Sequence, residues 1–339
     1  YTSSPAQFAQ SFGQVAAAGA QFIGSKHNGT ANTRRVWQKE LTGIAEAPHL
    51  AQSALGGWGL AIHHSYDPQT EKLYYGDGSV RTFSATVETV AGDVISTSPT
   101  LGDGGPATQA DIRSPYDLVA APDGSYYFVD SYHYIVRHVA PDGIIRTVAG
   151  NYTYSSPVID EIPATQASLS PAIGLDLGPD GSLYIADSQN HRVRKVTPDG
   201  IIHNLAGGVL AANLGDGGLA TQAQLWGPSS VAAAAYGSVY IADQGNGRIR
   251  KVGTDGIIST FAGGGAYANG WDNIPATEAW LGNPATVEIA PDGSVYIANQ
   301  ARISRVDTDG SIHTVAGGGY LGFDGDGGPA KLAHLNGPS

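Results

Sequence analysis

Short apolar runs alternate with polar turns at a spacing that repeats along the chain. In the clearest copy, residues 182–196, an apolar strand is followed by a polar turn and by a second strand in which basic and apolar residues alternate. Alternation with a period of two predicts β-strands with one buried face. The same text returns in three further places: residues 238–252, residues 294–306 and, more loosely, residues 125–139. The chain is therefore predicted to repeat one β unit.

Each unit holds more than those two strands. In the unit at residues 168–207, a first strand precedes a Pro-Asp-Gly turn, and a fourth strand follows the basic one. The fourth strand closes with Thr-Val-Ala-Gly or a variant of it. The closing glycines are Gly92, Gly150, Gly207, Gly263 and Gly317, at intervals of 58, 57, 56 and 54 residues. Four strands of about five residues with tight turns need only roughly 40 residues, so each unit also carries a connecting loop.

The connecting loops have a sequence of their own. The clearest copy, Gly-Asp-Gly-Gly-Pro-Ala-Thr-Gln-Ala, occupies residues 102–110. Related copies lie at 215–223 and 325–333, and weaker ones at 160–167 and 272–279. Because the loop repeats in step with the strands, loop and strands belong to the same unit.

Four-stranded antiparallel units at near-constant spacing predict an all-β fold, a β-propeller in which each unit is one blade. First strands with small side chains, such as residues 231–235, fit a narrow axis on which the blades converge. A six-bladed ring is expected, with its sixth blade only begun at 318–339; a five-bladed ring with a C-terminal tail is the alternative. The five visible blades are at residues 55–92, 111–150, 168–207, 224–263 and 280–317.

Residues 1–54 do not match the repeat, whereas the propeller is expected over residues 55–339. The first segment is too short and too poor in large apolar residues for a core of its own. We interpret it as a β-rich N-terminal segment, either a plug on the propeller or the tail of a preceding domain. The chain has no methionine and begins at Tyr1, so we expect it to be a piece of a longer protein.

Composition narrows the function classes. Lys and Arg number 18 against 30 Asp and Glu, which gives a net charge of −12. That balance argues against nucleic acid and anionic membranes as the main partners. The chain has no cysteine, so disulfides and thiolate metal sites are excluded. No run of about 18 apolar residues is present, and no membrane insertion is expected.

The strand pair at residues 183–196 resembles the NHL repeat. Its text is Leu-Tyr-Ile-Ala-Asp-x-x-Asn-x-Arg-Val-Arg-Lys-Val, and Asn190-His191-Arg192 nearly keeps the tripeptide that gives the repeat its name. The resemblance is strong over residues 111–317, where it recurs in phase. It implies an NHL-type β-propeller.

A second resemblance lies at the start of the expected propeller. Residues 55–68, Leu-Gly-Gly-Trp-Gly-Leu-Ala-Ile-His-His-Ser-Tyr-Asp-Pro, and residues 73–78 look like the corresponding part of bacterial Rhs/YD-repeat proteins related to teneurins. That resemblance implies a large secreted or cell-surface protein in which a β domain precedes the propeller and a YD-repeat shell follows it. Nothing after residue 92 is YD-like, so no shell, toxin or autoproteolysis function is carried over to this chain.

The Asp-Gly-rich loops raise the question of calcium, which binds several carboxylate and carbonyl oxygens. A helical calcium-binding loop would need a third acid and a distant bidentate glutamate, which these loops lack. The favoured interpretation is a turn in which glycine supplies positive φ and aspartate caps backbone N–H groups. No cofactor is predicted, although calcium stays open. Its candidate ligands are Asp103, Asp216, Asp324 and Asp326.

Polar residues recur once per blade on the second and third strands. The second-strand residues are Asp130, Asp187, Asp243 and Asn299, and we interpret Arg137, Arg194, Arg250 and Arg305 as equivalent on the third strands. A catalytic site needs unlike groups at one place, so this recurrence favours a structural role. We expect hydrogen bonds inside each blade.

Histidines carry the argument for an enzyme. The resemblance implies that some NHL-like propellers are lyases with zinc held by histidines near the axis, and a catalytic zinc site needs three ligands plus water. Here His203 and His313 share a position on the fourth, outermost strand. The other histidines of the repeat region are scattered, at His63, His64, His133, His138, His191 and His334. No catalytic residue and no metal site is predicted.

Aromatic residues in turns and connecting loops are the candidate binding residues, because tyrosine and tryptophan are enriched at interface hot spots. They are Tyr132, Tyr134, Tyr152, Tyr154, Tyr267, Trp271, Trp280 and Tyr320. The alternative is that they cover blade edges. Asn28 and Asn151 fit the glycosylation sequon, a short pattern that often arises by chance.

These observations predict an extracellular or cell-surface binding and assembly module without chemistry of its own. The expected partners are proteins, including copies of the chain, and glycans. A propeller short of its last blade exposes strand edges that another chain could complete, so fibre formation by strand complementation is one form of this hypothesis. The alternatives are a metal-dependent lyase or hydrolase with a site in the axial channel, and a structural scaffold inside an Rhs toxin shell.

Overall fold

The computed structural model is all-β, and the helices in its described part are single 3-10 turns. The structure describes residues 21–27, 34–40, 66–67, 72–74, 80–82, 88–92, 101–154, 158–209, 213–266, 272–299, 301–318 and 321–338.

Four consecutive antiparallel sheets each contain one of the expected blades. Within each sheet, four strands follow one another in chain order and pair with their sequence neighbours. The strands are β7 (Pro115–Ala120), β8 (Tyr126–Asp130), β9 (Ile135–Val139), β10 (Ile145–Ala149), β12 (Gly174–Leu177), β13 (Leu183–Asp187), β14 (Arg192–Val196), β15 (Ile201–Gly207), β16 (Pro228–Ala233), β17 (Val239–Asp243), β18 (Arg248–Val252), β19 (Ile258–Gly263), β21 (Thr286–Ile289), β22 (Val295–Asn299), β23 (Arg302–Val306) and β24 (Ser311–Ala316).

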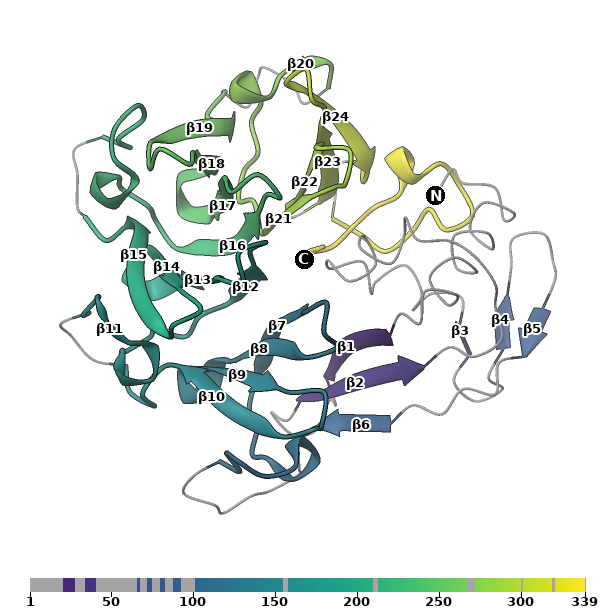
Figure 1. Cartoon of the computed structure of the whole chain (residues 1–339). Helices are drawn as coiled ribbons and strands as arrows, with labels where there is room; N and C mark the ends of the chain where they lie inside the picture. Colours follow the sequence, from purple (N-terminus) through teal and green to yellow (C-terminus); the bar gives the residue numbers. More distant parts are fainter. Residues whose placement is uncertain are drawn as a thin grey trace.

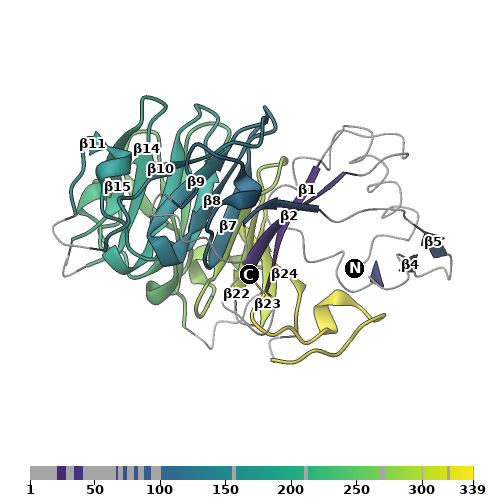
Figure 2. The ribbon, with the colours of Figure 1, turned by 90° about the horizontal axis from the view of Figure 1, so that it is seen from below.

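The four sheets are arranged around a common centre (Figure 1). The first strand of each blade lies innermost, and β7, β12, β16 and β21 contact one another in that order. Turned by 90°, the blades stand side by side with their strands running in the same general direction (Figure 2). This arrangement confirms the β-propeller predicted from the repeat. Small residues such as Ala232 and Ala234 are buried near this centre, in agreement with the narrow axis expected from the first strands.

The hydrophobic core lies between neighbouring blades. Leu183 and Ile185 of β13 belong to one buried cluster with Val129 and Val136, which come from the preceding blade. Each of these side chains is less than 5% exposed. Full burial of such a side chain is worth about 1.5–3 kcal/mol, so the contact between blades is the main apolar contribution to stability.

A glycine closes the outer strand of each of the four complete blades because no larger residue fits there. At Gly207 the backbone has φ +80°, and an added Cβ would lie 2.3 Å from the carbonyl oxygen of His191. Gly263 repeats this geometry with φ +86° and a distance of 2.4 Å to the carbonyl oxygen of Gly247. The recurring Ala-Gly at the end of the fourth strand is therefore a steric requirement of the blade.

The connecting loops, called connectors below, bind two blades at once. The connector at 215–223 shows this on its following blade, where Gly217 N–H donates to Ile258 and Ala220 N–H to Gly256. On its other side, its 3-10 turn η6 (Ala220–Gln222) packs on β15 of the preceding blade. The other connectors have the corresponding turns η2 (Ala107–Gln109), η4 (Ala164–Gln166), η9 (Ala276–Glu278) and η10 (Ala330–Leu332), and two of them add a short outer strand, β11 (Ile162–Pro163) or β20 (Ile274–Pro275).

The first expected blade differs from the others. Its closing strand β6 (Glu88–Ala91) pairs with β2 (Arg34–Glu40), which in turn pairs with β1 (Gln21–His27). The short strands β3 (Tyr66–Asp67), β4 (Lys72–Tyr74) and β5 (Val80–Thr82) form a sheet of their own. The pairing of β6 with a strand from residues 1–54 was not expected, because β2 carries none of the repeat text. The division at residue 54, and the sixth blade, stay predictions.

Candidate functional site

Cross-strand pairs show which ends of the strands lie together. Pro228 at the start of β16 faces Asp243 at the end of β17, and Arg248 at the start of β18 faces Gly263 at the end of β19. One end of each blade therefore carries the start of the first strand, the turn between the second and third strands, and the end of the fourth. The Pro-Asp-Gly turns lie at the opposite end.

Six of the eight exposed aromatic side chains in the described part of the chain lie at the first of these ends, which we call the aromatic face; Tyr236 lies at the opposite end and Phe323 in the last connector. The six come from turns and strand starts that span the junctions of successive blades, and each is between 38% and 58% exposed. The aromatic face consists of Tyr116, Tyr132, Tyr152, Tyr154, Trp226 and Trp280.

Trp226 is held by contacts to two blades. Its backbone N–H donates to the Asp243 carboxylate at 2.8 Å, and its carbonyl oxygen accepts the N–H of Gly245. Its ring lies 5.4 Å from the ring of His191, which belongs to the preceding blade. The His191 Nδ1 also accepts the N–H of Gly227 at 3.0 Å. Trp226 was not among the predicted binding residues, although it stands directly before the Gly-Pro that opens a first strand.

The tyrosines of the β7–β10 blade form a second group on the aromatic face. The guanidinium of Arg113 lies 5.3 Å from the ring of Tyr132. Tyr134, in a left-handed backbone conformation with φ 58°, lies 6.1 Å from Tyr154 between ring centroids. Aromatic rings immobilised in this way lose little conformational entropy when a partner binds, so the face is suited to recognition.

The contacts of the two other described candidates are local. The Tyr152 hydroxyl contacts the Thr147 hydroxyl at 3.0 Å and donates to Asp103 at 3.4 Å. Trp280 lies against the backbone at Gly282. The structure thus places the five described candidates, Tyr132, Tyr134, Tyr152, Tyr154 and Trp280, at one end of the blades. The remaining three candidates, Tyr267, Trp271 and Tyr320, lie outside the described residues.

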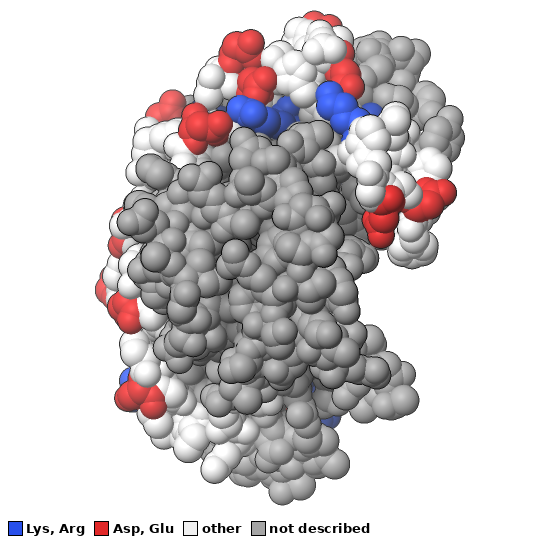
Figure 3. All heavy atoms as spheres, turned by 90° about the vertical axis from the view of Figure 1, so that its right-hand side faces the viewer, with Lys and Arg blue, Asp and Glu red and all other residues white. Residues whose placement is uncertain are grey.

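The opposite end carries carboxylates from the Pro-Asp-Gly turns and their variants, and we call it the aspartate face. Each aspartate accepts the N–H of the residue two positions on. Hydrogen bonds from Ser125 hold the pKa of Asp123 below its usual value, and those from Ser294 do the same for Asp292. The members are Asp123, Asp142, Asp180, Asp199, Asp255, Asp292 and Asp309. Seen from one side in Figure 3, red acidic side chains are spread round the described rim, while Lys and Arg gather in small groups.

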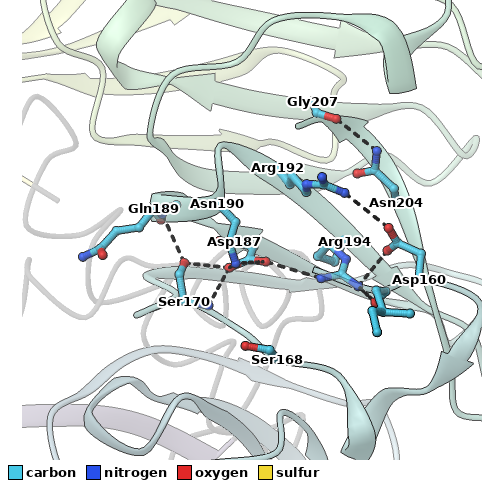
Figure 4. Close-up of polar contacts among 12 residues, drawn as sticks. Asp160, Ser168, Ser170, Asp187, Gln189, Asn190, Arg192, Arg194, Asn204 and Gly207 are labelled. Atoms are coloured by element: carbon cyan, nitrogen blue, oxygen red, sulfur yellow. Dashed lines mark hydrogen bonds and ion pairs between the residues drawn. The ribbon is translucent and has the colours of Figure 1, made fainter. Parts of the chain in front are cut away.

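A buried polar chain links the second strand, the third strand and the connector of each of three blades, and Figure 4 shows it in the β12–β15 blade. In the β12–β15 blade, Asp187 accepts hydrogen bonds from the backbone N–H and the hydroxyl of Ser170 at 2.8 and 2.6 Å. Arg194 lies between two carboxylates, with Nη1 3.5 Å from Asp187 and Nη2 2.7 Å from the connector residue Asp160. The hydrogen bonds expected inside a blade are confirmed here, and the connector carboxylate is an addition.

The same chain recurs in the neighbouring blades. Arg137 is 2.7 Å from Asp103 and 3.9 Å from Asp130. Arg250 is 2.6 Å from Asp216 and, like the other two arginines, is fully buried. Burial raises the pKa of Asp130, against the opposing effect of its hydrogen-bond partners and of Arg137.

The expected equivalence of Arg305 with these arginines is wrong. Arg194 pairs across the sheet with Ile185, and the residue that pairs with the corresponding Ile297 is Ser304. Arg305 instead pairs with Tyr296 and forms half-exposed ion pairs with Asp292 and Asp307. The β21–β24 blade therefore has a serine where the others bury a guanidinium, and an asparagine, Asn299, where the others have the aspartate.

The calcium candidates are placed as follows. Asp103 and Asp216 are bound by buried arginines, which supply the positive charge that a cation would bring. Asp324 lies 2.6 Å from the imidazole of His334, and Asp326 is exposed. Among the described residues no group of three histidine, cysteine, aspartate or glutamate side chains is placed to hold a metal ion.

The described histidines bind local partners. His203 contacts Glu161 at 2.8 Å, His313 contacts Asp307 at 3.0 Å, and His133 contacts Asp130 at 2.9 Å. The glycosylation candidate Asn151 accepts hydrogen bonds from Thr153 and donates to the carbonyl oxygen of Gln166. The other candidate, Asn28, lies outside the described residues. Within the described part of the chain, no helix has the length and apolar character needed to span a bilayer.

Comparison with known proteins points to one family of propellers. A family model described as Teneurin NHL domain matches residues 208–270. Teneurin-m of Drosophila melanogaster is 31% identical over 307 residues, which are 83% of this chain and 11% of that protein. Teneurin-3 of Danio rerio is 28% identical, again over 83% of this chain and 11% of the relative. This chain therefore spans about a tenth of the length of these relatives.

Among solved structures, a virginiamycin B lyase from Staphylococcus aureus is 15% identical and covers 86% of this chain and 68% of its own, with a TM-score of 0.41. At that TM-score the likeness adds nothing to the fold that the chain's own sheets show. The repeat text, the four-stranded sheets and the relatives agree: the chain carries an NHL-repeat β-propeller that resembles the NHL domain of teneurins.

Proposed function

We propose that this propeller is a non-catalytic binding module of a larger extracellular or cell-surface protein, and that it contacts partner proteins through the aromatic face. The proposal is supported by the relatives, which are teneurins about nine times as long as the matched region. It is carried by one observation, the gathering of exposed aromatic side chains on one end of the blades.

The two ends of the blades differ in surface chemistry: one presents exposed aromatic rings, and the other presents carboxylates. Aromatic rings bring large contact area and bury well when water is excluded, and they dominate the energy of many interfaces. The aromatic face provides such rings, and the tilted contact of Trp226 with His191 holds one of them in place. Carboxylates on the aspartate face stay hydrated and repel acidic surfaces. A partner is therefore expected on the aromatic face.

In its finer form, the proposal includes a bacterial Rhs-type parent protein, self-association and glycan contacts. Copies of the chain would associate either through the aromatic face or by strand addition at a blade edge, and repeated contacts of that kind would build a fibre. A glycan could bind to the same residues, because a sugar ring packs against the flat side of an aromatic ring such as that of Trp226 or Tyr132.

Self-association is tested by sedimentation of the 339-residue chain over a wide concentration range. The chain should associate, and Trp226→Ser or Tyr132→Ser should weaken the association at least tenfold, the effect of losing about 1.4 kcal/mol at a hot spot. Tyr236→Ser is the matched control, because Tyr236 is 59% exposed but lies in the turn between β16 and β17 at the opposite end. Equal weakening by all three variants would contradict the role of the aromatic face.

If the chain remains a monomer, binding to a glycan array with the same three variants tests the other partner. Loss of bound glycans in the Trp226 and Tyr132 variants alone would support the face as a sugar-binding surface. Absence of both self-association and glycan binding would remove these two finer forms of the proposal.

A further inference from the structure

Carboxyl groups lie on the inner strands of three blades, and two of them accept hydrogen bonds from backbone N–H groups of those strands. Asp117 of β7 accepts the N–H of Leu118 and, across the blade junction, the N–H of Leu175 on β12, both at 2.8 Å. Asp176 of β12 accepts the N–H of Leu177 at 2.8 Å and that of Ala233 on β16 at 2.6 Å. Unpaired N–H groups on an edge strand need such acceptors, so these carboxylates link neighbouring blades at the axis.

Glu288 is the third member of this inner group. It faces Tyr296 across β21 and β22, as Asp176 faces Tyr184 across β12 and β13, so the two carboxyl groups occupy the same position in their blades. Among the described residues, no N–H or O–H group donates to Glu288. The next junction, between β16 and β21, uses a hydroxyl instead, because Ser230 Oγ accepts the N–H of Val287 at 3.3 Å.

Within the described part of the chain, no lysine or arginine forms an ion pair with Glu288. β22 brings the phenol of Tyr296 opposite it, and Arg305 lies on the far side of that ring, 6.0 Å from its centroid. The adjacent inner strand β16 carries no ionisable residue, and β17, which also contacts β21, carries Tyr240 and Asp243. The charged groups that act on it are Asp176 and Asp117. Burial, reinforced by these two carboxylates, raises the pKa of Glu288 to about 8, and burial raises the pKa of Asp117 and of Asp176 to about 6.

We propose that Glu288 makes the inner face of the propeller sensitive to protons: its neutral form leaves the Asp117 and Asp176 links between blades undisturbed, and its ionisation loosens them by repulsion. When Glu288 is neutral, it adds no negative charge to the carboxylates of Asp117 and Asp176. Ionisation adds a third half-buried charge with no cation beside it. The loss of stability is expected at the blade junctions, because Asp117 and Asp176 accept hydrogen bonds across them near the axis.

The direction of the pH dependence follows from the raised pKa of Glu288. A glutamate in an unfolded chain ionises near pH 4.3, so between that value and about pH 8 the folded domain holds a proton that the unfolded chain has lost. The stabilising effect of that proton is complete below the unfolded pKa and is lost as pH rises through the folded value. The domain should therefore lose stability from this site between mildly acidic pH and pH 9.

Thermal unfolding of the full 339-residue chain from pH 5 to pH 9 tests the proposal with Glu288→Gln, which mimics the neutral carboxyl. At pH 5 the variant and the original chain should melt within about 1 °C of each other. At pH 9 the variant should melt at least about 2 °C higher. Glu278→Gln, on the exposed turn η9, is the control and should show no pH-dependent difference.

A pH-independent difference between Glu288→Gln and the original chain, or a variant that melts lower at pH 9, would overturn the proposal. If Glu288→Gln does not fold, carbon NMR of glutamate carboxyls in the unmodified chain decides the matter, because the chain has only seven glutamates. One of the resonances should titrate above pH 7. Titration of all seven below about pH 5.5 would show that no glutamate holds its proton in the fold.

Discussion

The guanidinium of Arg250 lies 2.6 Å from the carboxylate of Asp216, although the two residues are 34 positions apart. The arginine is fully buried on β18, and the aspartate belongs to the connector that precedes the blade. A second carboxylate, Asp243, lies 3.5 Å away on the neighbouring strand. The connector is thereby tied to the interior of the blade by charge as well as by backbone hydrogen bonds.

Replacement of Arg250 by alanine should lower the free energy of unfolding by about 3–5 kcal/mol, because it leaves the buried Asp243 carboxylate without its cation. Denaturant unfolding measures the change. Arg305→Ala is the matched control on the next blade. Its ion pairs are half exposed, and it should cost less than about 1 kcal/mol. Similar losses in the two variants would mean that Arg250 has no special role.

The β21–β24 blade suggests how the buried pair can be exchanged. There, Asn299 and Ser304 stand where the neighbouring blade has Asp243 and Arg250. We expect Asp243→Asn and Arg250→Ser to be costly one at a time, while the double variant recovers about 1–3 kcal/mol relative to the sum of the single changes. A double-mutant cycle by urea unfolding gives this coupling directly, and strict additivity would speak against a shared network.

Two glycines with similar backbone angles should respond differently to alanine. Gly217 has φ +80° with open space around it, so Gly217→Ala should cost about 1–2 kcal/mol from backbone strain alone. Gly263 has φ +86°, but an added Cβ would lie 2.4 Å from the carbonyl oxygen of Gly247. Gly263→Ala should therefore exceed the cost of Gly217→Ala by at least about 1 kcal/mol. Thermal unfolding measures the stability of both variants: Gly217→Ala reports backbone strain alone, and Gly263→Ala reports the same strain together with the steric clash.

Calcium should have little effect on the connectors at Asp103 and Asp216, since arginines already bind these carboxylates. Adding millimolar calcium, or removing it with a chelator, should shift the melting temperature by less than about 1 °C. A melting temperature that rises with calcium concentration would instead indicate a site in the folded chain. Asp324→Asn and Asp326→Asn would then locate that site in the last connector.

The four-stranded blades could be predicted from sequence because alternation and closing glycines repeat at a near-constant interval. Strand order, the innermost first strands and the polar contacts of Asp187 with Arg194 follow from that repetition. The misassignment of Arg305 has a physical cause. When the repeats are aligned by residue type, Arg305 is the arginine nearest the expected position. Side chains alternate between the two faces of a strand, however, and the register places Ser304, not Arg305, on the buried face.

Other features leave no trace in a single repeat. The contact between Asp160 and Arg194 joins residues whose separation exceeds any local pattern, so only the folded blade reveals it. The aromatic face was found in part, because its loop residues such as Tyr132 were predicted as binding residues, whereas the exposure of Trp226 becomes visible only in the folded blade. β2 pairs with β6, the first closing strand, although the sequence of β2 does not match the repeat. This pairing could therefore not be predicted from the repeat.

In three blades, the preceding connector hydrogen-bonds to the blade and contributes its aspartate to the blade's buried arginine, as Asp103 does for Arg137. The unit that can be copied whole during gene duplication is therefore a connector with the four strands after it, such as residues 213–263. A copy cut at those points carries its own charge pair and its own closing glycine. A chain built in this way could gain or lose whole units without needing a new kind of junction.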